Sequence, residues 1–476
     1  MTSTFGGIGM ARTGLNAARA ALDVAGQNIA NANTAGYTRQ RVSTSSIAAP
    51  AQVGRVTTPI TSAGQGVNVD GIARLADSFL DARVRSTAGT AGYTGVRAEA
   101  LSTLEASFNE PGDQGLSTDL QSFWASWQDL SNHTGQTATG AVVIERGTIL
   151  TSQISAGYRA VESQWTDVRT QADSQAAELN TAADQIASLN KTIRTTLAAG
   201  GSVNEMADQR SALAATVASL AGGSVKTSAD GTVDVLVGGN PLVSGEYANH
   251  VRVAGSYTLQ GTSASPAQLE WVAHPGSSVG LDSGRLAGSL SLIAPSNANG
   301  TGGVLAETAD TYNKLAEQLT STVNGIHAAG TTSTGATGLN FFAAAAGVPA
   351  AAGLSVIPVT VADLAAGKAG AGALNGSTAD ALSQIGSKPG SPDQTWSNLV
   401  TTTAVLTRGE LQQSALADLG YDSATSSQLA SASVDLDEEN VNMLMQQKAY
   451  QASARVLSAM DEMLDTLINK TGMVGR

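Results

Sequence analysis

The sequence predicts a mainly α-helical, elongated helical bundle whose two ends pair as coiled-coil-like helices and whose middle carries a small inserted β domain. Apolar residues repeat every seven positions near both ends of the chain, the spacing of paired helices. A long central run repeats in steps of three, four or seven, which only a helix places on one face. Between residues 224 and 274 the pattern changes to alternation, the period of a β-strand.

The N-terminal segment predicts a helix with a heptad pattern. Bulky residues occupy one heptad position and alanines the other, three residues later: Ile8, Leu15, Leu22 and Ile29, then Ala11, Ala18, Ala25 and Ala32. A helix with small residues at such a position lies close to its partner. Gly14 and Gly26 each cost about 1 kcal/mol relative to alanine in a helix interior. We therefore expect this helix to need a partner in order to fold.

The C-terminal segment repeats the same spacing. Its apolar residues are Leu436, Met443, Tyr450, Leu457 and Leu464, reinforced by Met460, Leu467 and Ile468. Two interpretations fit this pattern: both terminal helices pack on a globular core, or they form an intramolecular or intersubunit coiled coil. The run Asp435, Asp437, Glu438 and Glu439 precedes the apolar residues. Carboxylates there complement the positive end of a helix dipole. We favour this role for the acidic run over a role as a metal site.

Three further helices are predicted between the ends. The longest follows apolar residues from Ile154 to Leu197 and ends at Gly200 and Gly201. A second spans residues 203–220, and a third runs from Leu305 to Ile326 before Gly330. These distant segments predict one helical bundle.

The remaining patterns divide the chain. Val233, Val235 and Val237 alternate after an Asp-Gly turn and open a β region. Residues 43–71 and 330–376 are rich in Gly, Ala, Ser and Thr and read as linkers or short hairpins. We expect a terminal domain and linker of 1–70 with 433–476 and a helical domain of 71–223 with 300–432, which includes the irregular segment 330–376. The inserted β domain is expected at 224–299.

Composition excludes several classes of function. The 476 residues carry 26 Lys plus Arg against 39 Asp plus Glu, so phosphate backbones and anionic lipids repel the chain. No nucleic acid or membrane insertion is expected, and no stretch approaches the roughly 18 apolar residues of a membrane span. There is no cysteine, which excludes disulfides and thiolate chemistry. The N-terminus lacks the basic and apolar regions of a secretory signal, so any export must leave the chain uncut.

The sequence nominates no catalytic, cofactor-binding or metal residue. Walker, HExxH and dinucleotide-binding motifs are missing from the sequence. His133, His250, His274 and His327 show no ligand spacing, and we expect structural or surface roles for them. Residues 276–280, Gly-Ser-Ser-Val-Gly, match the GxSxG elbow. That elbow requires a strand before the serine and a helix after it, and the local pattern is turn-like, so we treat the match as chance and expect no enzyme.

Several segments carry a family resemblance. GLNAARAALDVAGQNIANANTAGYTRQRV (14–42) and the C-terminal segment 434–469 resemble the paired end segments of bacterial flagellar rod, hook and hook-associated axial proteins. Tyr37-Thr38-Arg39-Gln40 is similar to the Tyr-Ser/Thr-Arg-Gln run of the hook-associated protein 1 family. Segments 64–86, 206–225, 283–292 and 323–327 also resemble that family. Ser211 departs from it, since an acidic residue is usual there.

The resemblance implies a structural subunit of the junction between flagellar hook and filament, with its β domain facing outward. It implies a ring of about eleven subunits at the hook tip that allows filament growth. The implied partners are hook protein, a second hook–filament junction protein and a cytoplasmic export chaperone at the C-terminal helix. The implied location is extracellular, reached through the flagellar type III apparatus. Hook protein, a distal rod protein and a secreted adhesin-like protein are the alternatives.

Two sets of residues follow as candidate sites. The expected assembly interface on the terminal helices is Ile8, Leu15, Leu22, Ile29, Met443, Tyr450, Leu457, Met460, Leu464 and Leu467. We infer that the chaperone holds Leu457, Met460, Leu464 and Leu467. The N-terminal axial motif comprises Asn28, Asn31, Asn33, Gly36, Tyr37 and Arg39. Asn and Gly are ordinary turn formers at a helix end, and Tyr37 with Arg39 either contacts a neighbouring subunit or forms a half-buried edge.

Overall fold

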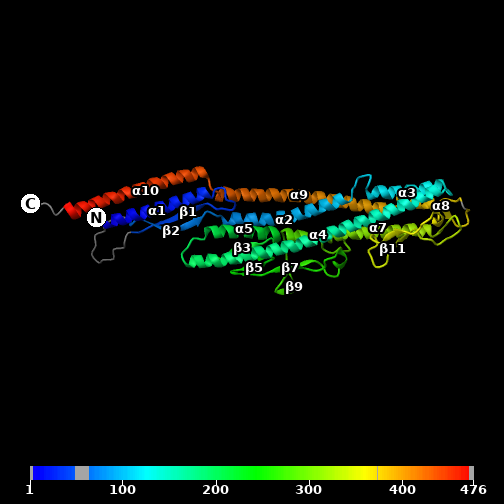
Figure 1. The fold of residues 1–476 in the computed structure, drawn as a ribbon, viewed down its shortest axis with the longest axis horizontal. Helices are drawn as coiled ribbons and strands as arrows, with labels where there is room; N and C mark the ends of the chain where they lie inside the picture. The colour runs from blue at the N-terminus through cyan, green and yellow to red at the C-terminus, as the bar shows by residue number, and fades with distance from the viewer. Residues whose placement is uncertain (1–3, 49–63, 373, 471–476) are drawn as a thin grey trace, which may run out of the picture.

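The computed structural model describes residues 4–48, 64–372 and 374–470. The molecule is an elongated rod with both chain ends at the same tip (Figure 1). Helix α1 (Thr4–Ala30) and helix α10 (Leu436–Asp465) lie side by side there, and a π-helical turn, η3 (Thr466–Lys470), continues α10. We call α1 and α10 the terminal hairpin. The predicted mainly α fold with paired terminal helices is confirmed.

A β-hairpin lies along α1. Strand β1 (Gln40–Ser46) pairs antiparallel with β2 (Val67–Arg74), and Gln40 lies opposite Arg74. Both strands contact α1. The predicted linker 43–71 is thus partly a hairpin, and its residues 49–63 lie outside the described part.

Long helices form the middle of the rod (Figure 1). Helix α4 (Thr137–Ala198) has 62 residues and contains the predicted run. Helices α5 (Asn204–Ala221) and α7 (Val304–His327) match the other two predicted helices. Helix α2 (Ser78–Ser107) lies along α9 (Pro392–Ala432), and the bundle is completed by three shorter helices, α3 (Leu116–Asn132), α6 (Arg285–Leu292) and α8 (Ser377–Ser383).

Two small antiparallel sheets form the inserted β region beside α4, away from α9 (Figure 1). The first has the order β3-β4-β5-β6 and the second β7-β8-β9. The alternation of Val233, Val235 and Val237 is explained because these side chains are buried in one core with Leu179 and Ile186 of α4. The bounds are β3 (Ser224–Thr227), β4 (Val233–Val237), β5 (Asn240–Ser244), β6 (Tyr247–Ala248), β7 (Val251–Ala254), η1 (Leu259–Gly261), β8 (Gln268–Trp271) and β9 (His274–Ser278).

The segment 330–376 forms short pairs at the far end of the rod. Strands β10 (Gly330–Thr331) and β13 (Gly367–Lys368) pair, as do β11 (Phe342–Ala344) and β12 (Leu354–Val356), with the 3-10 turn η2 (Val361–Asp363) between. Asn324 of α7 bonds to the backbone of Phe341 and Phe342. The main core begins at this end with Phe123, Trp127, Phe341, Phe342 and Trp396, and it continues along the rod to Trp165.

Candidate assembly surface and interdomain clamp

Small residues make the contact between α1 and α10. A Cβ atom added at Gly7 would lie 2.7 Å from Met460 Cε, and one at Gly14 would lie 3.1 Å from Ser453 Oγ. Residue 7 lies opposite residue 460, and residue 14 lies opposite residue 453. The residue numbers of the two helices thus run in opposite directions, so the helices are antiparallel. Ala11, Ala18 and Ala25 are buried on the same side of α1. Gly14 weakens the isolated helix, but in the structure it allows the close approach of α10.

The expected heptad of α1 is partly exposed in the single chain. Ile8, Leu15, Leu22 and Ile29 are only half-buried. Ile8 and Leu15 directly follow the close-approach positions Gly7 and Gly14 and thus lie about 100° further round the helix. Helix α1 also ends at Ala30, so Ala32 lies in the turn and extends no heptad. The side chains of Ile8, Leu15, Leu22 and Ile29 therefore stay partly accessible to solvent.

The predicted residues of α10 also line an open face. Met443, Met460 and Leu464 are half-buried. Tyr450 and Leu457 are each 37% exposed and Leu467 is 54% exposed. None of these side chains is fully buried in the single chain. The structure thus leaves the predicted interface residues available to a partner, and their role in assembly stays a prediction.

A second exposed stripe on α10 was missed from the sequence. Val441, Met445, Val456 and Met463 are all about half exposed. Their spacings of four, eleven and seven return to one helical face. Alanines at positions 452 and 459 interrupt the run of bulky side chains on this face, which concealed the pattern. A groove of about 640 Å³ lies between α1, α10 and the β1–β2 hairpin, and alanines of α1 together with charged residues of α10 and β1 line it.

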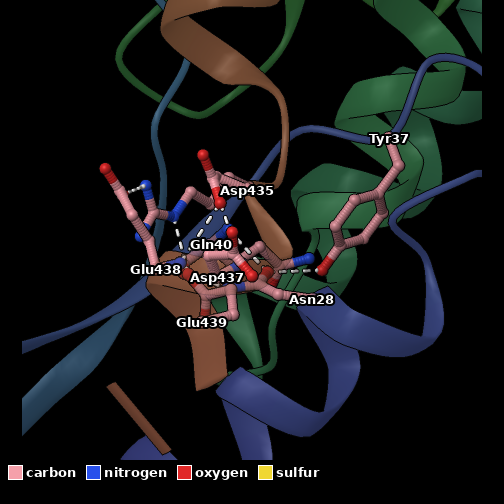
Figure 2. Close-up of polar contacts among 8 residues, drawn as sticks. Asn28, Tyr37, Gln40, Asp435, Asp437, Glu438 and Glu439 are labelled. Carbon is pink, nitrogen blue, oxygen red and sulfur yellow. Dashed lines mark hydrogen bonds and ion pairs between the residues drawn. The ribbon is translucent and has the colours of Figure 1, made fainter. Parts of the chain in front are cut away.

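The axial motif builds a clamp at the end of α1 (Figure 2). The side chain of Asn28 is buried, and its Oδ1 accepts hydrogen bonds from the Tyr37 hydroxyl at 2.9 Å and the Gln40 backbone N–H at 3.0 Å. Its Nδ2 donates to the Gln40 carbonyl at 2.9 Å. Asn28 therefore ties the last turn of α1 to the start of β1. Burial, with the charges of nearby carboxylates, raises the pKa of Tyr37 to about 12, so its hydroxyl stays a donor.

Arg39 joins this clamp to the start of α10, where Figure 2 labels Glu438 and Glu439. Its Nε donates to Glu439 Oε1 at 2.7 Å and its Nη1 to Glu438 Oε2 at 2.8 Å. The Arg39 backbone N–H donates to the carbonyl of Ala432, the last residue of α9. Burial lowers the pKa of Arg39, but the bonds and charges of the two glutamates raise it overall. The expected acidic run at the start of α10 thus binds an arginine, while Asp435 caps the helix by accepting from Asp437 and Glu438 N–H.

The other side of the clamp is helix α5. Asp208 is buried, accepts from the Thr38 backbone N–H at 3.1 Å and pairs with Arg74 of β2 at 2.6 Å. Gln40 donates to Glu205 and accepts from Asn204. No sequence pattern predicts these partners as site residues, although Asp208 lies in the family-like segment 206–225.

The rest of the axial motif forms a turn. Asn31 bonds to Gln27 and Thr34, and Gly36 has φ 78°, a conformation that favours glycine. Asn33 is exposed. The turn interpretation fits Asn31 and Gly36, whereas Asn28, Tyr37 and Arg39 hold separate elements together within one chain. A contact of Tyr37 and Arg39 with a neighbouring subunit stays a prediction.

The structure does not supply the context for the GxSxG match. Ser278 ends β9, an exposed antiparallel strand at the edge of its sheet, whereas the elbow needs a buried strand leading into a helix. Within residues 4–48, 64–372 and 374–470, no group of three or more His, Asp or Glu side chains is placed to hold a metal ion. The same residues include no helix long and apolar enough to cross a membrane.

Comparisons with known proteins define the class first. Residues 8–38 match the flagella basal body rod protein family, and residues 426–470 match the family described as flagellar basal body rod FlgEFG protein C-terminal. These ranges contain most of the terminal hairpin and much of the clamp, which places the chain among flagellar axial proteins. Residues 101–342 match the helical domain of flagellar hook-associated protein FlgK.

Relatives specify the family. Flagellar hook-associated protein 1 of Bacillus subtilis is 30% identical over 522 residues, with all of both chains covered. The Escherichia coli protein of that name is 29% identical, with 71% of this chain and 59% of the relative covered. The flagellar hook junction protein FlgK from Burkholderia pseudomallei has the same fold, with a TM-score of 0.62 at 14% identity over 75% of this chain and all of that one.

The chain belongs to the flagellar hook-associated protein 1 family. It is a structural component of the hook–filament junction of the bacterial flagellum.

Proposed function

We propose that the chain forms a closed ring of about eleven subunits at the hook tip through head-to-tail contacts between terminal hairpins. The observation that carries this proposal is the exposed apolar surface of α10, including Val441, Met445 and Met463. Burial of such side chains contributes roughly 1.5–3 kcal/mol each. Isolated soluble chains rarely leave a stripe of this kind uncovered. Ile8, Leu15, Leu22 and Ile29 supply a second face beside it.

The ring would contact hook protein on one side and the second hook–filament junction protein on the other, so that the filament grows from it. The division into a terminal domain (1–70 with 433–476), a helical middle domain (71–223 with 300–432) and an outward β domain (224–299) belongs to this proposal. The role is structural, with no catalysis and no cofactor. Support comes from the clamp, whose ionisable groups are engaged with one another rather than gathered in a reactive pocket.

We also propose export without a cleaved signal, with a cytoplasmic chaperone holding Leu457, Met460, Leu464 and Leu467. The exposed fractions of Leu457 and Leu467 support this, because a masked face cannot polymerise early. Leu457→Asp with Leu464→Asp should abolish capture of the chaperone in a pull-down from export-competent cells. Val405→Asp on α9 is a matched control, since Val405 is also exposed but lies outside the proposed site. Retained binding by the double variant would show that the chaperone binds elsewhere.

The experiment that tests the main proposal is electron microscopy of cells from which the gene is deleted, with flagellin assayed in the medium. Bare hooks with flagellin lost to the medium are expected. Missing hooks would place the chain below the junction, and normal filaments would overturn the proposal.

A further inference from the structure

Helix α9 presents a ridge of apolar side chains to solvent. Val405, Leu416 and Leu419 are 67%, 69% and 67% exposed. Their side of the helix is opposite the one that packs on α2, where Thr403, Thr407 and Ala424 are buried. We call Val405, Leu416 and Leu419 the α9 ridge. Arg408 is exposed beside it and has no hydrogen-bond or ion-pair partner among the described side chains.

A groove of about 930 Å³ runs along another side of the same bundle. Its walls come from α2, α4, α5, α6 and α9, and small residues dominate the surface: Ala88, Ala91, Gly92, Gly95, Ala212 and Ala215. Small residues allow another helix to approach closely. We call this surface the middle groove.

The groove is also rich in unpaired negative charge. Glu99, Glu178 and Asp418 line it, and their carboxylates form no ion pair or hydrogen bond within the described part of the chain. Arg285 is the cation that lines it. An occupant that brings a positive charge together with apolar side chains would complement this surface.

The ridge and the groove lie at the same height along the rod. Asp418 and Tyr421 line the groove, and Leu416 and Leu419 of the ridge belong to the same turns of α9. The proposal sets the axis of the closed ring near the long axis of its subunits, so that equal heights of neighbouring chains face each other. We propose that the α9 ridge of one copy of this chain docks in the middle groove of the next copy. The ridge supplies Leu416 and Leu419, with Arg408 beside them, and the groove supplies the small residues and the carboxylates.

This inference rests on the proposed ring and names its lateral contact. It is heterologous, since ridge and groove are different surfaces, as a ring of more than two subunits requires. The α9 ridge also continues the exposed apolar face of α10 into the middle of the rod, because α9 leads directly into α10.

The natural chain has no cysteine, so two introduced thiols report one contact. Cells would produce Leu416→Cys with Ala212→Cys in place of the natural chain. Isolated flagella would be treated with a short bis-maleimide and blotted for this chain. Leu416→Cys with Ser188→Cys is the matched control, because Ser188 is exposed on α4 outside the groove. A ladder of covalent multimers is expected from the groove pair, at least fivefold stronger than from the control.

Charge provides an independent measurement. Arg408→Glu in the groove-pair background should reduce the ladder several-fold, and Glu178→Arg added to it should restore most of the yield. Cells that grow filaments but give only monomers, or equal ladders from both pairs, would overturn the docking proposal while leaving the junction role intact. Normal filaments in the deletion strain would instead remove the ring on which the docking depends.

Discussion

The guanidinium of Arg39 binds the carboxylate of Glu439 at 2.7 Å although 400 positions separate the two residues in sequence. Arg39 directly precedes β1, and Glu439 lies in the first turn of α10. Glu439 is 4% exposed on its side chain, so the pair lies where the terminal hairpin meets the rest of the rod. The orientation of the hairpin therefore depends on this pair together with the backbone bond from Arg39 to Ala432.

Replacing Arg39 tests the clamp. Arg39→Ala leaves the buried Glu439 carboxylate without its partner, which costs about 2 kcal/mol for a lost bond to a charged group. We expect faster hydrogen exchange in the first two turns of α10, with α4 unchanged. Arg39→Lys should recover only part of the protection, because an ammonium lacks the planar fork that holds two carboxylates. Equal exchange in all three proteins would show that the clamp does not fix α10.

Gly14 tests the small-residue contact between α1 and α10. Gly14→Leu places a large side chain 3.1 Å or less from Ser453, and overpacking of this kind costs about 1–3 kcal/mol. We expect loss of hairpin structure, measured by hydrogen exchange across residues 445–460. Gly26→Ala is the control, since nothing lies within 4 Å of its added Cβ. It should stabilise the helix by about 1 kcal/mol, and destabilisation by both changes would contradict the assigned contact.

The terminal helices and the long central helix could be predicted from sequence because their apolar spacing is regular. Which line of α1 touches α10 could not, since Gly7 and Gly14 carry no apolar signal. Glycine allows the close contact because it has no side chain, and only the antiparallel register of the two helices reveals the close approach to Met460 and Ser453. The regular spacing of bulky residues such as Leu15 therefore predicts that they form the centre of the helix contact, whereas in the structure they are half-buried.

Helices α2 and α9 were not predicted as separate elements. Their mutual face uses Thr403, Thr407 and Ala424 together with the Arg97–Glu410 pair, so hydrophobic periodicity is weak. The clamp illustrates a second limit. Asn28 and Arg39 could be singled out by resemblance, but their partners Asp208 and Glu439 lie far along the chain, and polar pairs leave no spacing pattern that identifies them.

Arg169 tests how the β region is attached to α4. This side chain is 1% exposed, donates to the carbonyls of Val253 and Ser256, and lies over the Tyr257 ring. Arg169→Ala leaves two carbonyls without a donor, and at roughly 1–3 kcal/mol each we expect a loss of about 2–4 kcal/mol in unfolding free energy.

Denaturant unfolding measures that loss. Arg169→Lys should recover less than half, because one ammonium does not reproduce the forked donor geometry. Arg159→Ala is the control, being exposed on the same helix, and should change stability by less than about 0.5 kcal/mol. An equal effect at both positions would contradict the anchoring role.

His327 predicts a pH dependence of stability. The ring is buried at the C-terminal end of α7, where Nδ1 bonds to the Leu339 carbonyl at 2.7 Å and Nε2 to the Ala365 N–H at 3.0 Å. The Leu339 carbonyl can only accept a hydrogen bond and the Ala365 N–H can only donate one, so Nδ1 carries the proton and Nε2 is unprotonated. Burial lowers the pKa of His327 below its ordinary 6.5, although the bond to Leu339 opposes this.

The sign of the effect follows from proton uptake. Above pH 6.5 the ring is neutral in both the folded and the unfolded chain, and its bonds contribute fully. As the pH falls below 6.5, the unfolded chain takes up a proton that the folded chain resists, so stability falls by up to about 1.4 kcal/mol per pH unit. Urea unfolding of the natural chain and His327→Gln at pH 7.5 and 5.5 measures this. The difference between the two proteins should shrink at pH 5.5, because glutamine does not titrate and other groups cancel in the comparison. An unchanged difference would mean that the ring does not need to be neutral to hold residues 339 and 365 against α7.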